Sequence, residues 1–199
     1  MDSDTKKDQI LDASLPVFCR YGFSKTTMTD IAEAAGVSRA ALYLHFNNKE
    51  AVFQAGSRRA HATVMADVDA VLGESGPALE RIDRAVTSYL QGLMDEISAS
   101  PHGQELFDSN LALSRDITIQ SRQHLTTRIG EALDEAAARA EIDLTAIEAT
   151  SAELAALILA TVEGIKAGGG GKGLSSATSL FLRVLSAAVS SQRAPRANA

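Results

Sequence analysis

Apolar side chains recur every three or four residues along most of this chain, which is the spacing of one face of an α-helix. The pattern begins over residues 6–21, where Ile10, Leu11, Leu15 and Phe18 share one face. It then predicts two short helices between residues 27 and 45, and longer ones over 48–72, 78–98, 101–113, 115–140, 144–167 and 174–191. The sequence shows neither a strand-like alternation nor an internal repeat. We therefore expect an all-α fold of about nine helices.

Two capping signals and a glycine mark a helix-turn-helix near the N-terminus. Thr27 can cap the first short helix, and Asp30 can return a hydrogen bond to the Thr27 amide. Gly36 supplies a left-handed residue that ends this helix, because it has no Cβ to clash. Ser38 caps the second helix. A helix-turn-helix of this kind places its second helix in the major groove of DNA.

The second short helix carries the side chains that we expect to read DNA. Arg39 lies in its first turn, where a guanidinium reaches guanine O6 and N7 or a phosphate. Ala40 and Ala41 are small enough to admit the backbone and to touch a thymine methyl. Tyr43, His45 and Lys49 are better placed for phosphates. The candidate DNA-binding residues are Thr27, Thr29, Ser38, Arg39, Ala40, Ala41, Tyr43, His45 and Lys49.

The same stretch resembles the TetR family of bacterial one-component transcriptional regulators. The residues that carry the resemblance are Gly22-Phe23, Thr26-Thr27, Asp30-Ile31-Ala32, Ala35-Gly36-Val37-Ser38, Leu42-Tyr43, His45-Phe46 and Lys49-Glu50. The resemblance covers about the first quarter of the chain. It implies a helix-turn-helix DNA-binding domain over residues 1–48, followed by a helical effector-binding and dimerisation domain over residues 49–199.

The last two predicted helices are apolar over more of their circumference than one core contact requires. Ordinary intramolecular packing accounts for part of each apolar stripe. The resemblance implies that these helices also build a four-helix bundle between two subunits, and hence a homodimer. The expected interface residues are Leu154, Leu157, Ile158, Val162, Ile165, Leu180, Phe181, Val184 and Leu185.

The middle of the chain is where a small-molecule effector would bind, and its side chains are mostly apolar. The candidate lining residues are Met65, Met94, Phe107, Leu111, Ile117 and His124. Each of these can equally be plain core. The chain has no Trp, 3 Tyr and 6 Phe, so an aromatic cage for cationic compounds is disfavoured and a small, largely apolar effector fits better.

Charge and composition limit how and where this protein can act. The net charge is -6, and the first fifty residues hold six basic against seven acidic side chains, so specific DNA binding should need two copies of the domain. The single Cys19 excludes an internal disulfide and fits a small buried side chain better than a redox sensor. Without a long apolar run or a signal-peptide pattern, a cytoplasmic location is expected.

Two other classes of protein compete with a ligand-responsive regulator. An enzyme is disfavoured because no nucleophile elbow, metalloprotease motif or dinucleotide fingerprint occurs, and we expect no cofactor and no metal site. The run Gly168–Gly173 fails as a phosphate loop, because Lys166 stands where the motif needs its first glycine and Gly173 follows Lys172. An architectural DNA binder would not need about 150 further residues. We therefore expect a homodimeric repressor that a small, largely apolar effector releases from its operator.

Overall fold

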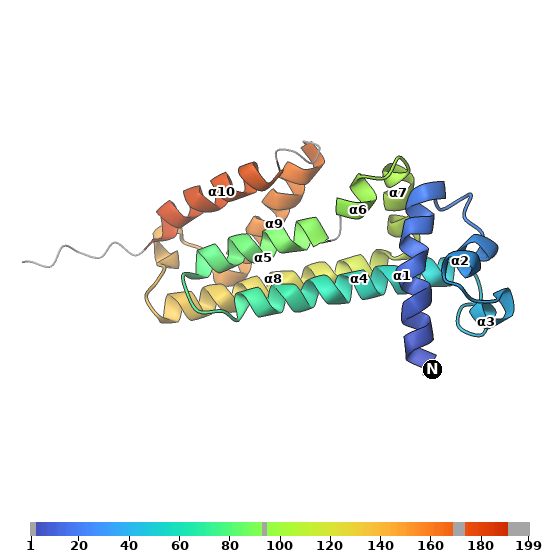
Figure 1. Cartoon of the computed structure of the whole chain (residues 1–199). Coiled ribbons are helices and arrows are strands. Elements are labelled where there is room, and N and C mark those ends of the chain that lie inside the picture. Colours follow the sequence, from blue (N-terminus) through green and yellow to red (C-terminus); the bar gives the residue numbers. More distant parts are fainter. Residues whose placement is uncertain (1–2, 93–94, 169–173, 191–199) are drawn as a thin grey trace, which may run out of the picture. The chain divides into compact units, whose positions relative to one another are not determined.

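The computed structural model describes residues 3–92, 95–168 and 174–190 (Figure 1). Its named elements are all helical, which confirms the expected all-α fold. The α-helices are α1 (Ser3–Tyr21), α2 (Met28–Ala34), α3 (Arg39–Tyr43), α4 (Lys49–Leu72), α5 (Ala78–Gly92), α6 (Asp95–Ser98), α7 (Gly103–Leu113), α8 (Arg115–Ala138), α9 (Ser151–Gly168) and α10 (Leu174–Val189), and a 3-10 helix, η1, covers Leu144–Ile147. Among the residues described, no helix has both the length and the apolar character needed to cross a bilayer.

The chain packs into two compact units. Unit 1 comprises Met1–Val64 and Leu90–Ser121, and unit 2 comprises Met65–Tyr89 and Arg122–Ala199. Helices α4, α5 and α8 therefore contribute residues to both units. The expected boundary between functional domains, after residue 48, lies at the start of α4 and stays a prediction.

Unit 1 is built around a core that α1, α2, α3 and the first part of α4 share with α7. Helix α2 packs against both α1 and α3 (Figure 1). The rings of Phe18, Phe23 and Phe53 form an aromatic cluster, with centroids 5.2 to 5.8 Å apart. Leu106 of α7 is fully buried in the same core. The helix-turn-helix thus shares its core with a helix more than fifty residues further along the chain.

The turn between α1 and α2, residues 22–27, is held by a lysine from α4. Gly22 has a φ of +78°, which ends α1. The Lys49 Nζ atom donates to the carbonyl oxygens of Phe23, Ser24 and Thr26, at 2.8, 2.9 and 3.1 Å. The same ammonium lies 4.7 Å from the centroid of the Phe23 ring. A lysine ammonium has three donors, so this turn uses all of them.

Unit 2 has a separate apolar core, in which α9 and α10 pack against each other. Its fully buried side chains include Val68, Ile82, Val86, Leu125, Ile129, Leu133, Ile158 and Val162. The backbone amide of Asp143 donates to the carbonyl of Val189 at 2.7 Å, which fastens the segment before η1 to the end of α10.

One of the expected helices is divided in the structure, and another is described on both sides of residues 93–94. The prediction of one helix over 144–167 is wrong, because Glu148 takes a left-handed conformation with a φ of +50° between η1 and α9. Thr150 and Glu153 then form a capping box, in which each backbone amide donates to the other side chain at 2.9 and 3.2 Å. The segment expected as one helix over 78–98 contains α5 and the four-residue α6.

The contacts of Lys49 predict a role in stability. Replacing Lys49 with Met keeps much of the apolar stem but leaves three backbone carbonyls without their charged donor. We expect Lys49→Met to lower the free energy of unfolding by about 1.5–3 kcal/mol, measured by urea denaturation. Lys25→Met, at an exposed lysine within the same turn, is the control and should change stability little. Equal stability of the two variants would show that the carbonyl contacts of Lys49 contribute nothing measurable.

Candidate nucleic-acid interface

Helix α2 begins with the predicted capping box. The Thr27 amide donates to Asp30 Oδ2 at 2.8 Å, and the Asp30 amide donates to Thr27 Oγ1 at 3.2 Å. The Thr27 hydroxyl also donates to Asp30 Oδ2, at 2.7 Å. Hydrogen bonds from the Thr27 side chain and backbone hold the pKa of the Asp30 carboxyl below its ordinary value. Thr27 is therefore used first of all as a helix cap, and Thr29 lies half-buried in the first turn.

The turn from α2 to α3 also has the predicted geometry. Gly36 is left-handed, with a φ of +63°, and the amide of Val37 donates to the carbonyl of Ala32 at 2.9 Å. Ser38 Oγ accepts a hydrogen bond from the Ala41 amide at 3.1 Å, which caps α3. Leu42 is completely buried. One side of α3 is thereby fixed against the core, and its other side faces solvent.

The solvent-facing side of α3 consists of Arg39, Ala40 and Tyr43, which are all exposed. The Arg39 guanidinium carbon lies 5.9 Å from the centroid of the Tyr43 ring, which is within cation–π distance. Leu44, which follows α3, is 84% exposed. We call these four residues the α3 surface. Leu44 is not among the residues expected to contact DNA, because Leu42 fills the helical core position and a second leucine beside it carries no distinguishing signal in the sequence.

Besides the cap residues Thr27 and Ser38 and the half-buried Thr29, three further predicted DNA-binding residues have other contacts or less exposure. The assignment of Lys49 to a phosphate is corrected, because its three ammonium donors are used by carbonyls of the α1–α2 turn. Ala41 and His45 are half-buried beside the α3 surface.

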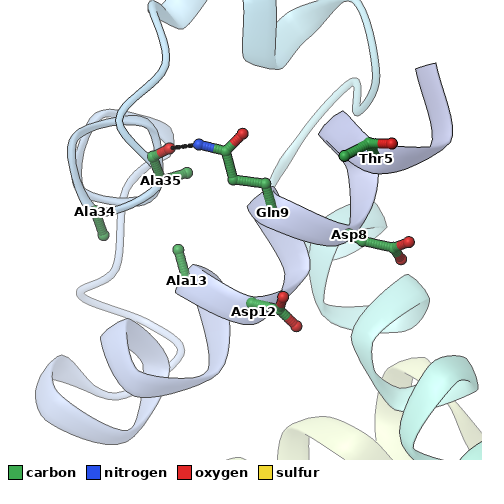
Figure 2. A pocket seen from close by; sticks show the side chains of 7 residues that line it. All are labelled: Thr5, Asp8, Gln9, Asp12, Ala13, Ala34 and Ala35. Atoms are coloured by element: carbon green, nitrogen blue, oxygen red, sulfur yellow. Dashed lines mark hydrogen bonds between the residues drawn. The ribbon is translucent and has the colours of Figure 1, made fainter. Parts of the chain in front are cut away.

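Two acidic side chains of α1 are paired within unit 1. Arg59 of α4 lies 3.4 Å from Asp8 Oδ1 and 2.6 Å from Asp12 Oδ1. These carboxylates also border an open groove between α1 and α2, across which Gln9 donates to the carbonyl of Ala35 at 2.7 Å (Figure 2). The groove contains none of the residues expected to line an effector pocket.

The candidate effector residues are distributed over both units. Phe107, Leu111 and Ile117 belong to unit 1, whereas Met65 and His124 belong to unit 2. Leu111 is 65% exposed, and His124 Nε2 lies 3.1 Å from a carboxylate oxygen of Asp69 at the protein surface. Met94 lies outside the described residues. The grouping of these residues around one effector therefore stays a prediction.

The expected dimer residues fall into two groups. Leu154, Ile158, Val162 and Leu185 are buried within the chain itself, so they are core residues rather than surface. Ile165 and Phe181 are half-buried. Leu157, Leu180 and Val184 are 54%, 55% and 63% exposed. The exposed apolar surface of α9 and α10 is therefore narrower than the sequence stripe.

Sequence similarity to known proteins lies in the N-terminal part of the chain. Residues 10–55 match the model of bacterial regulatory proteins of the tetR family. The chain is 42% identical over 62 residues to the HTH-type transcriptional regulator TtgR of Pseudomonas putida, which is 31% of this chain and 30% of TtgR. It is 35% identical over 48 residues to IcaR of Staphylococcus epidermidis, an HTH-type negative transcriptional regulator of the biofilm operon icaADBC, over 24% and 26% of the two chains.

Solved structures extend the likeness to the whole fold. SmeT, the repressor of the Stenotrophomonas maltophilia multidrug efflux pump SmeDEF, superposes with a TM-score of 0.68 and 22% identity, over 94% of this chain and 91% of SmeT. The fatty acid degradation regulator FadR of Bacillus halodurans gives a TM-score of 0.67 and 19% identity, over 93% and 96% of the two chains. At these identities the likeness establishes the fold.

The matched sequence covers less than a third of the curated relatives. The names of these relatives are those of transcriptional regulators and not of enzymes. The family model and the curated relatives place the sequence similarity in the N-terminal helix-turn-helix, where residues 10–55 match the tetR family of bacterial regulatory proteins, and the solved structures share the fold of this chain.

Proposed function

We propose that this protein is a ligand-responsive transcriptional regulator that binds operator DNA as a homodimer in the cytoplasm. The observation that carries the proposal is the α3 surface, an exposed arginine, alanine, tyrosine and leucine on a helix whose other side is fixed in the core. Such a helix can enter a major groove without rearrangement of its own domain. The tetR match over the same residues supports this use of α3.

Each residue of the α3 surface has a chemistry suited to DNA. Arg39 can donate two hydrogen bonds to guanine, and its guanidinium lies within cation–π distance of the Tyr43 ring. Ala40 and Leu44 offer apolar contacts to thymine methyl groups. Tyr43 and His45 can donate to phosphates, which positions the helix without reading sequence. Lys49 does not contact DNA in this proposal; it holds the α1–α2 turn, which precedes the helices that carry this surface.

A homodimer would compensate for the lack of net positive charge in the helix-turn-helix domain. With six basic and seven acidic side chains in the first fifty residues, one domain gains little from phosphate attraction. Two linked domains bind two half-sites, and the second contact is then intramolecular. The exposed side chains of Leu157, Leu180 and Val184, on two helices that pack together, offer an apolar surface for the pairing.

The names of two similar proteins bear on the direction of regulation, and the composition of the chain bears on the kind of effector. IcaR is named as a negative regulator and SmeT as a repressor, so repression is the favoured direction for this chain. Release by a small, largely apolar effector accords with the apolar middle of the sequence. An enzyme has no support among the relatives' names, and an architectural protein would leave the helices after α4 without a use.

The proposal predicts that Arg39 sets base preference. DNA selected from a random pool by the wild type should converge on a two-fold symmetric sequence, and Arg39→Ala should bind that sequence about 1–3 kcal/mol more weakly, with relaxed preference at one position of each half-site. Lys25→Ala is the control for the loss of one nearby positive charge, and it should weaken all DNA sequences alike. A wild type that selects no sequence would contradict the proposed function.

A second prediction concerns the apolar surface of α9 and α10. Leu157→Glu should prevent dimerisation, because burial of an unpaired carboxylate costs on the order of several kcal/mol, and operator binding should fall with it. Ala152→Glu adds the same charge at another exposed position of α9 and should sediment like the wild type. If Leu157→Glu remains a dimer with normal operator affinity, the subunits pair through a different surface.

A further inference from the structure

Helix α7 contacts the turn that leads into the helix-turn-helix, although it lies about eighty residues away in sequence. Glu105 Oε1 accepts a hydrogen bond from the Ser24 amide at 2.7 Å. The Glu105 carboxylate also occupies the space that a side chain at Gly22 would need. Just before α7, the Ser100 hydroxyl donates to the carbonyl of Cys19, in the last turn of α1, at 2.6 Å. One short segment thus contacts both the end of α1 and the turn that follows.

Two opposite charges hold a single peptide group of this turn. The carbonyl of Phe23 accepts from the Lys49 ammonium at 2.8 Å, and the N–H of the same peptide group, on Ser24, donates to Glu105. A cation on the oxygen and an anion on the N–H polarise the group in the same sense, which strengthens both hydrogen bonds. The Phe23–Ser24 peptide is therefore fixed between α4 and α7.

Glu105 is itself held in place and charged. The Ser24 hydrogen bonds, together with the nearby His102 and Lys25, keep the pKa of Glu105 below its ordinary value. His102 Nδ1 lies 3.6 Å from Glu105 Oε2. At the other end of α7, Gln54 donates to the carbonyl of Leu113 at 2.7 Å, and Ser57 donates to Asn110 at 2.8 Å. Helix α7 is thus attached to α4 as well as to the turn.

Hydrogen bonds and helix packing connect the α1–α2 turn to α3, the helix that carries the α3 surface. The Thr26 hydroxyl donates to the carbonyl of Gly22 at 2.7 Å, and the next residue, Thr27, caps α2. Helix α2 packs against α1 and α3. A shift of the Phe23–Ser24 peptide would therefore displace the start of α2 and, with it, the α3 surface.

We propose that Glu105 is a positioning residue for DNA recognition, which sets the placement of the α3 surface from α7 through the Ser24 amide. The inference rests on the proposed function. The Glu105–Ser24 hydrogen bond connects α7 directly to the helix-turn-helix domain. Helix α7 also carries the candidate effector residues Phe107 and Leu111. A change in the position of α7 would then alter operator affinity without any change in the DNA-contacting side chains.

The test compares Glu105→Ala and Glu105→Gln on the selected operator and on DNA of random sequence. Glu105→Ala should bind the operator about tenfold more weakly, because the Ser24 amide loses its acceptor. Its affinity for random DNA should stay equal or rise slightly, since one negative charge is removed. Glu105→Gln keeps an oxygen that can accept from Ser24, so operator affinity should return to within about threefold of the wild type.

Two controls separate positioning from charge and from folding. Asp108→Ala removes a negative charge from the exposed side of α7, where Asp108 accepts only a hydrogen bond from Gln104 among the contacts described, and it should leave the ratio of operator to random binding unchanged. Hydrogen exchange of the Ser24 amide should be faster in Glu105→Ala than in the wild type and in Glu105→Gln. Thermal melts should show that the wild type and both variants are folded.

The outcomes distinguish this inference from the proposed function. Normal operator affinity in Glu105→Ala would overturn the inference, and so would an equal loss in Glu105→Ala and Glu105→Gln, because the acceptor oxygen would then be irrelevant. A rise in operator affinity in both variants would mean that only the charge matters, and would also overturn it. A wild type that selects no operator would remove the proposed function, and the inference with it.

Discussion

The arrangement of the helix-turn-helix depends on three hydrogen bonds that the Lys49 ammonium donates. The chain reverses between α1 and α2 over a few residues, and the carbonyls of Phe23, Ser24 and Thr26 have no partners in a helix or strand. Backbone groups of this kind need partners when water is partly excluded. One lysine, lying against the Phe23 ring, satisfies all three and ties the turn to α4. The position of α2, and hence of α3, follows from this contact.

Signals confined to a few residues predicted the local structure of the helix-turn-helix. Thr27 with Asp30, the left-handed Gly36 and the Ser38 cap all have the geometry that their spacing indicates, because each motif is closed by atoms only two or three residues apart. The break before α9 had a signal of the same kind in Thr150 and Glu153. That signal was overlooked because the apolar spacing continues across it.

The remaining features depend on contacts between distant parts of the chain. The role of Lys49 is fixed by carbonyls more than twenty residues away, and that of Glu105 by an amide eighty-one residues away, so periodicity could not reveal either. Spacing also cannot separate a buried apolar residue from an exposed one on a broad stripe. Ile158 and Leu157 are neighbours in the same helix, yet the first is fully buried and the second is 54% exposed. Apolar character alone likewise does not specify a cavity, so the grouping of the candidate effector residues around one ligand stays a prediction.

The central claim is that two copies of the α3 surface read DNA together. Two recognition helices can dock in successive major grooves only at about one helical turn apart, roughly 34–36 Å. Hydroxyl-radical footprinting of the protein on its selected operator tests this directly. A dimer with two such helices should protect two half-sites on one face of the duplex, about 10 base pairs apart or a multiple of that, and the two should appear together as protein is added. A single protected half-site, or two that fill independently, would contradict it.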